Sequence, residues 1–319
     1  MGEAVRGGTG QGVNMPRIQA GAHPQHLLAT LLGDYDFAER DLVPSAAIVR
    51  LLAEFGVTSV SARNTLSRLA KRGLIEHVRH GRKMSYRLTA EAKRIHGARL
   101  AHFLRFGAAP VPDTGTWTTV VFSLPEGQRD RRRMLRLRLQ EAGLASLFDG
   151  VWIAPGDRCE KVARILEELS AGEAAALMVA EFASSTFGGR DPVTAFDLDG
   201  LRAGYTEFVQ RYTPLLGRVR AGEIALAEAL VLRTELMDAW RLFPDADPGL
   251  PTNLLPADWP LPAARAVFVE IYDTLAPLAE LRLRSLMEPY LGEQANRIRA
   301  YSPSDLRPAK GGAAPPAGR

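Results

Sequence analysis

The feature that most constrains this chain's fold is an ordered run of helix and strand patterns between residues 44 and 88. Apolar residues at helical spacing predict one helix over Pro44–Phe55 and another over Ser59–Arg72. Two strand-like segments, Leu74–His80 and Lys83–Leu88, follow directly. Two helices followed by a short hairpin in this order are typical of a winged helix-turn-helix. A further short helix is expected over Gln25–Leu32, ahead of this run.

The second of these helices has two chemically different sides. At 100° per residue, Ala62, Leu66, Leu69 and Ala70 gather on one side. The opposite side carries hydrogen-bond donors and cations, as a recognition helix in a major groove would. An ordinary amphipathic surface helix has the same pattern, and it is the following hairpin that favours DNA binding. The predicted DNA contacts on this helix are Ser61, Arg63, Asn64, Ser67, Arg68 and Lys71.

The hairpin is basic, and we expect Arg79, Arg82, Lys83 and Arg87 to lie near its tip. A wing of this kind lies on phosphates or reaches the minor groove. Base contacts are therefore expected from the helix and positioning contacts from the wing. Asn64 suits adenine and Arg68 suits guanine, although Arg68 can equally hold a phosphate.

The charge distribution agrees with a polyanion partner for this region. Residues 24–106 contain 14 Lys and Arg against 7 Asp and Glu, a net charge of +7. Residues 1–23 carry +1 and the rest of the chain −4, within a total of +4. A solvated basic surface would give the same asymmetry, so charge alone does not decide between the two interpretations.

The middle of the chain has a different order of elements. Strands are predicted at Thr116–Leu124, Gly150–Ala154 and Ala174–Phe182, with helices over Gly127–Ala142 and Cys159–Ser170. With an optional further strand after Gly150–Ala154, the order β-α-β-(β)-α-β predicts a ferredoxin-like α+β sandwich.

The first helix of this middle region is rich in arginine. Arg129, Arg133 and Arg136 share one outward stripe. A solvated helix face explains them without any ligand. The functional alternatives are contact with a DNA backbone or with the phosphates of a coenzyme A ligand, because guanidinium groups match phosphate geometry.

From Leu198 onward the pattern is mostly helical. Leu201–Gly217, Ala221–Phe243 and Pro262–Leu291 each show apolar residues at helical spacing, and a Pro-rich connector over residues 244–260 separates the last two. Several aromatic side chains of this region either line a ligand pocket or belong to the core. They are Trp240, Phe243, Trp259, Phe268 and Tyr272, and all except Phe243 are candidate effector contacts.

These patterns divide the chain into an α+β protein of three domains. A disordered lead over 1–23 precedes the winged helix-turn-helix domain at 24–106, and the ferredoxin-like domain at 114–197 and the helical domain at 198–300 follow, with a disordered tail over 301–319. The lead lacks the apolar segment of a signal peptide, no apolar run is long enough to cross a membrane, and Cys159 is the one cysteine. We therefore expect a cytoplasmic protein.

Enzyme chemistry has little support in the sequence. There is no Gly-rich phosphate loop and no Gly-x-Ser-x-Gly elbow, Cys159 has no recognisable partner base, and the pair His77 and His80 has no Cys or acidic cluster beside it. We expect no catalytic residue, no cofactor and no metal site. The alternatives to a regulator are an effector-independent structural DNA-binding protein and, with less support, a nucleic-acid-processing enzyme.

Several stretches resemble the PaaX family, repressors of phenylacetic-acid degradation operons. The resemblance covers about residues 24–291 in the expected domain order. It rests on Leu31–Tyr35, Ile48–Gly56, Ala62–Leu69, Leu147–Pro155, Asp247–Pro251, Leu254–Trp259 and Ala264–Phe268.

Membership would imply a Cas2-like middle domain and a homodimer bound to double-stranded operator DNA. It would also imply release by an aryl-acetyl coenzyme A thioester, phenylacetyl-CoA in the type members. The related nucleases place an aspartate at the end of the first strand of the Cas2-like fold. Val121–Leu124 has no acidic residue there, which counts against nuclease chemistry.

Overall fold

The computed structural model describes residues 24–37, 42–81, 83–182 and 191–306 of the 319. The predicted lead over 1–23, the wing residue Arg82 and positions 307–319 of the predicted tail lie outside these ranges. The chain divides into two compact units, each built from separate stretches of sequence. The first unit draws on 1–106, 211–241 and 266–319, and the second on 107–210 and 242–265. Helices and small sheets occur together, which confirms the α+β class.

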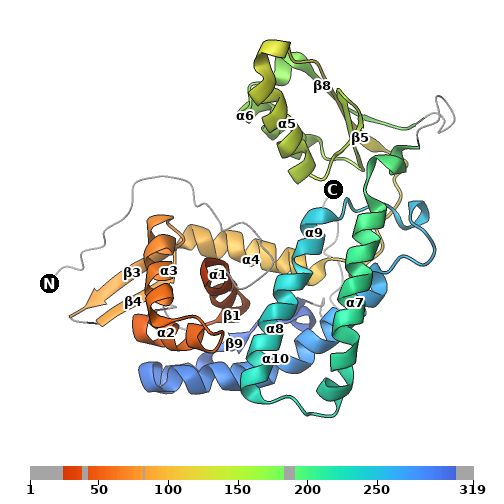
Figure 1. The fold of residues 1–319 in the computed structure, drawn as a ribbon. Helices are drawn as coiled ribbons and strands as arrows, with labels where there is room; N and C mark the ends of the chain where they lie inside the picture. Colours follow the sequence, from red (N-terminus) through yellow and green to blue (C-terminus); the bar gives the residue numbers. More distant parts are fainter. Residues whose placement is uncertain (1–23, 38–41, 82, 183–190, 307–319) are drawn as a thin grey trace, which may run out of the picture. The chain divides into compact units, whose positions relative to one another are not determined.

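The first unit contains the predicted winged helix-turn-helix (Figure 1). Its three-stranded antiparallel sheet has the order β2-β4-β3, so the predicted hairpin gains a short third strand from the residues just before α2. The elements are α1 (Pro24–Asp34), β1 (Tyr35–Asp36), β2 (Val43–Pro44), α2 (Ser45–Ala53), α3 (Ser59–Lys71), β3 (Ile75–His80), β4 (Lys83–Leu88) and α4 (Ala90–Arg105).

Local chemistry sets the two ends of α3. The Thr58 side chain accepts a hydrogen bond from the Ser61 backbone N–H at 3.3 Å, which satisfies one free donor of the first turn. Beyond the last turn, Gly73 has φ +70°, a left-handed conformation that glycine adopts without a steric penalty. The helix therefore begins and ends close to where its sequence pattern does.

The core of the first unit joins residues far apart in sequence. Leu28, Ile48 and Leu66 of the winged helix belong to one buried cluster with Leu230 and Leu283 of the C-terminal helices. The helical region predicted from Leu198 onward is therefore shared between the two units and does not form a separate one. Its elements are α7 (Leu198–Arg220), α8 (Leu226–Trp240), α9 (Leu242–Ala246), α10 (Leu261–Leu291) and β9 (Arg299–Ala300), which pairs antiparallel with β1.

The second unit contains the predicted ferredoxin-like sandwich. Its four strands are antiparallel in the order β6-β7-β5-β8, and helices α5 and α6 pack on one face through Leu135, Leu139 and Val162 (Figure 1). The elements are β5 (Trp117–Phe122), α5 (Arg129–Glu141), β6 (Ala145–Phe148), β7 (Val151–Pro155), α6 (Cys159–Glu168) and β8 (Ala175–Ala180).

The Pro-rich connector packs on this sandwich. Leu250 is buried with Trp117 and Ile153 in a second cluster of the same unit. Arg158 donates from Nη2 to the Pro248 carbonyl at 2.5 Å and from Nη1 to the Ala142 carbonyl at 3.1 Å. A long ordered loop here is thus explained by apolar burial and an arginine that binds its backbone.

Candidate nucleic-acid interface

Helix α3 has one buried and one exposed side, as its sequence pattern predicts. Ala62, Leu66 and Leu69 have at most 1% of their surface exposed and hold the helix on the core. Ser61, on the flank, is half-buried. The exposed predicted contacts are Arg63, Asn64, Ser67, Arg68 and Lys71.

The exposed side carries cations that are available to a polyanion. Arg63, Arg68 and Lys71 form no ion pair with any other described residue. Amide, hydroxyl and guanidinium groups on one helical face match the donors and acceptors that bases present in a major groove. A polyanion can therefore approach this face without displacing an ion pair between described residues.

One exposed residue of α3 is not indicated by the sequence pattern. Val60, in the first turn, is 65% exposed, more than any other large apolar side chain in the described ranges. The first turns of a recognition helix contact base edges, and apolar side chains there contact the thymine methyl group. An isolated apolar residue at a helix start has no periodic signal, which is why sequence patterning does not reveal it.

The basic residues of the wing lie at different distances from its turn. In the β3–β4 register Arg79 lies opposite Met84, and Lys83 lies opposite His80 beside the turn. Arg79 is exposed, and its Nε donates to the Gly81 carbonyl at 3.0 Å, which shapes the turn. Arg79 and Lys83 are therefore the described cations near the tip.

Arg87 does not lie where the sequence pattern predicts. It lies opposite Glu76, one pair from the base of the hairpin, and its Nε donates to the Glu76 carboxylate at 2.6 Å. The expectation that Arg87 lies near the tip is wrong. The six β3–β4 pairs follow one another without a shift, so Arg87 lies in the fifth pair from the turn. The cross-strand ion pair gives it a role in holding the hairpin together.

The arginines of α5, in the second unit, are mostly used within the fold. Arg136 pairs with Asp149, Arg138 with Glu168 at 2.7 Å, and Arg131 donates to the Leu169 carbonyl at 2.7 Å. Arg129 and Arg133 are exposed and have no ion-pair partner among the described residues. The predicted stripe thus has two cations open to a ligand, and the third is held by a carboxylate.

The predicted effector-binding aromatics are divided between the two units. Trp240, Phe268 and Tyr272 have no exposed surface and form a stack in the first unit, with ring centroids 4.5 and 5.1 Å apart. This burial matches the core alternative that the sequence left open for them. Trp259 belongs to the second unit, edge-on to Tyr205 at 6.0 Å.

Among the described residues there is no cluster of three or more His, Cys, Asp or Glu that could hold a metal ion. No helix in the described ranges is long and apolar enough to cross a membrane.

Three family models match consecutive parts of the chain. Residues 23–92 match the PaaX-like protein model, residues 111–192 the PaaX protein central Cas2-like domain, and residues 196–285 the PaaX-like protein C-terminal domain. The first match contains α3 and the wing, and the second contains the four-stranded sheet.

Relatives of known sequence or structure cover most of the chain. The Transcriptional repressor PaaX of Escherichia coli (strain K12) is 26% identical over 273 residues, which are 84% of this chain and 85% of that protein. A solved structure, the uncharacterized protein Rv0674 from Mycobacterium tuberculosis, aligns with a TM-score of 0.49 at 21% identity. That alignment covers 82% of this chain and 96% of the other.

Proposed function

The chain belongs to the PaaX family, and on this basis we propose that it is a transcriptional repressor that binds double-stranded operator DNA in the cytoplasm. The observation that carries the proposal is the exposed face of α3. There, cations and hydrogen-bonding side chains with no ion-pair partner among the described residues lie on a helix whose opposite side is buried through Ala62, Leu66 and Leu69. Base contacts then come from α3, and the wing residues Arg79, Lys83 and Arg82 position the domain on phosphates.

We further propose that the repressor controls a catabolic operon and is released by an aryl-acetyl coenzyme A thioester of the phenylacetyl-CoA type. Support for this effector comes from the resemblance to the family. In the chain, the exposed Arg129 and Arg133 are candidates for the phosphates of the coenzyme, with a DNA backbone as the alternative ligand. Contact by Arg136, Trp240, Trp259, Phe268 or Tyr272 stays a prediction.

The test is a gel shift with the DNA directly upstream of the gene that encodes this chain. We expect a retarded complex that competitor DNA of random sequence does not displace. Phenylacetyl-CoA should dissociate it, whereas coenzyme A alone should not. Binding to all sequences with equal affinity would contradict a repressor.

A second measurement separates a ligand-gated repressor from an effector-independent DNA-binding protein. A ligand that binds only the folded state stabilises it by RT ln(1 + L/Kd), where L is the free ligand concentration, so the melting temperature rises with ligand concentration. Phenylacetyl-CoA should therefore raise the melting temperature of the free protein. Sequence-specific DNA binding without any response to a panel of acyl-CoA esters would leave the DNA-binding part of the proposal and remove the effector.

A further inference from the structure

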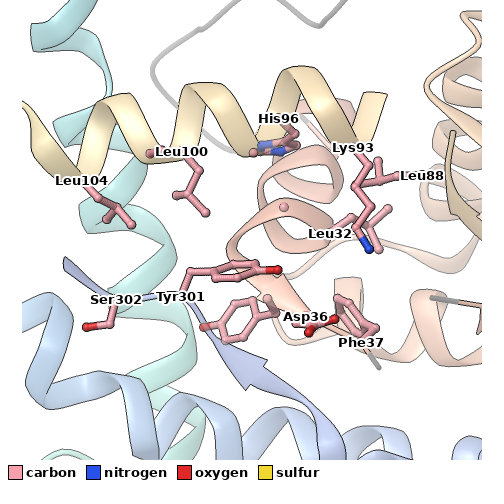
Figure 2. A pocket seen from close by; sticks show the side chains of 14 residues that line it. Leu32, Asp36, Phe37, Leu88, Lys93, His96, Leu100, Leu104, Tyr301 and Ser302 are labelled. Carbon is pink, nitrogen blue, oxygen red and sulfur yellow. The ribbon is translucent and has the colours of Figure 1, made fainter. Parts of the chain in front are cut away.

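A pocket with a cavity volume of about 260 Å³ lies within the first unit. Its walls are the end of α1, the β1 turn, the residue that ends β4, one face of α4, and the segment after β9 (Figure 2). All of these elements belong to the unit that carries α3 and the wing. Its lining residues include neither the arginine stripe of α5 nor the buried aromatic stack.

The lining is mainly apolar. Leu32, Phe37, Leu100 and Leu104 are all buried and supply aliphatic and aromatic surface (Figure 2). A cavity of about 150 Å³ with a lining of this kind already binds benzene, so 260 Å³ accommodates an aromatic ring with a short substituent. A nucleotide is far too large for it.

One ring nitrogen of the wall has no hydrogen-bond partner among the described residues. His96 lines the pocket, and its Nε2 lies 2.5 Å from the Ala29 carbonyl. Because a carbonyl oxygen only accepts, Nε2 carries the proton, and Nδ1 of the neutral ring is left as an acceptor. Nδ1 is buried without a hydrogen-bond partner among the described residues. A buried acceptor of this kind costs free energy until a bound molecule satisfies it.

The charged residues of the lining are Lys93 and Asp36. Lys93, an exposed residue of α4, lines one end together with Leu88, and Leu104 and Ser302 line the opposite end (Figure 2). A ligand whose ring enters the pocket can therefore keep an anionic or strongly polar remainder near Lys93, outside the apolar part.

Resting on the proposed function, we propose that this pocket binds the aromatic acyl end of the effector, while the coenzyme portion stays outside it. The ring would lie among Leu32, Phe37, Leu100 and Leu104. This assignment replaces the buried stack of Trp240, Phe268 and Tyr272 as the place where the aryl group is recognised.

The position of the pocket explains how such a ligand can affect DNA binding. Helix α1 packs against α3 in the core of the unit, and Leu88 is the last residue of the wing strand β4. A ring wedged between α1 and α4 therefore contacts the supports of both DNA-binding elements. If the arrangement that binds the ring best differs from the one that fits the operator, occupancy shifts the protein away from DNA.

The wall of the pocket that contains Tyr301 is held by hydrogen bonds to the rest of the unit. Tyr301 donates its backbone N–H to the Asp34 carbonyl at 3.0 Å, and the buried guanidinium of Arg233 donates to the Tyr301 carbonyl and, at 3.2 Å, to the Tyr272 carbonyl. The same guanidinium lies 3.7 Å from the Tyr272 ring centroid. Because these hydrogen bonds hold the Tyr301 wall in place, we expect α4 and the wing to be the elements that move when a ligand binds.

The experiment fills the pocket with a leucine side chain, introduced at a lining position that has room for it. Gly97 lines the cavity from within α4, and a Cβ added there meets no atom within 4 Å. Gly97→Leu should keep the fold and operator affinity but weaken phenylacetyl-CoA binding at least ten-fold, measured by calorimetric titration of the full chain. Ala101→Leu, from a second lining residue, should act in the same direction.

Gly217→Leu is the matched control, because Gly217 is also an exposed helical glycine with open space around its Cβ and it does not line the pocket. It should bind phenylacetyl-CoA like the wild type. Unchanged ligand affinity in both pocket variants, with the wild type binding normally, would overturn the pocket assignment and leave the proposed effector intact. Absence of binding to the wild type would instead remove the effector, and this proposal with it.

Discussion

At the scale of single residues, the exposed groups of α3 and of the wing differ in what they can recognise. Asn64→Ala and Arg68→Ala should relax sequence preference, at a cost of roughly 1–3 kcal/mol for each base that the side chain no longer reads. Lys83→Ala, at the wing tip, should weaken binding to all sequences alike and lower the salt dependence by about one counterion. Titrations of operator and scrambled duplexes at several salt concentrations measure both effects.

Since these three side chains are exposed, none of the variants should change the free energy of unfolding measurably. Arg87→Ala is the contrasting case, because it breaks the ion pair with Glu76 inside the hairpin. Equal reductions in affinity for operator and scrambled DNA in the α3 and wing variants would contradict the division between base reading and positioning.

His96 should make stability depend on pH. Burial lowers the pKa of His96, against the attraction of Asp34, so the ring stays neutral in the folded state. The unfolded chain takes up the proton at a pKa of about 6.5. Above that value His96 has no effect on the pH dependence, and as pH falls below it the free energy of unfolding decreases.

Thermal melting between pH 8 and pH 5.5 checks this expectation. The wild type should lose more stability over that range than His96→Asn, whose amide can still donate to the Ala29 carbonyl but does not titrate. Parallel curves for the two proteins would show that His96 is not the group responsible.

At the scale of elements, the helix that carries the DNA contacts depends on its cap. Thr58→Ala removes the side-chain acceptor of the Ser61 N–H and should lower the free energy of unfolding by about 0.5–2 kcal/mol, whereas Thr58→Ser should preserve the cap. Urea denaturation measures the difference. A decrease of the same size in both variants would mean that the methyl group of Thr58, and not its oxygen, stabilises the helix.

The elements that the sequence predicts well are those stabilised by nearby residues. The sequence pattern predicts α3 over Ser59–Arg72, and the helix runs over Ser59–Lys71, because its cap, its apolar stripe and the following glycine are all local signals. Three strands and both helices of the second unit are likewise predictable from alternating and helical periodicity, whereas the short strand β6 lies ahead of β7, where the pattern does not predict it.

Other elements depend on distant partners and could not be predicted. Strand β2 has two residues, too few for a periodic pattern, and exists because it pairs with β4. Helix α4 runs unbroken through Gly97, but glycine is a poor helix former, so the sequence signal for this helix is weak. The burial of Trp240, whose Nε1 donates to the Phe103 carbonyl at 2.9 Å, depends on a contact across 137 positions. The pocket beside α4 is invisible to sequence patterning for the same reason.

At the scale of the whole molecule, we expect a homodimer. One winged helix contacts a single half-site, and two related by a two-fold axis read a palindrome with half-sites about one helical turn, or a multiple of it, apart. Light scattering at micromolar concentration should give twice the mass of one chain, 34.8 kDa. A monomer that binds the operator with full affinity would contradict this prediction.

The mixed origin of the first unit's core has a consequence for how the protein is made. Leu28 and Ile48 leave the ribosome early, but Leu283, Met287 and Ile298 of the same buried cluster follow more than 200 residues later. At about 5–20 residues per second, the apolar side of the nascent winged helix stays uncovered for at least ten seconds. The ferredoxin-like part of the intervening segment can close first. A premature stop codon ahead of α10 would therefore yield a chain in which the core beneath α3 is incomplete. We expect chaperones and proteases to bind and degrade such a chain.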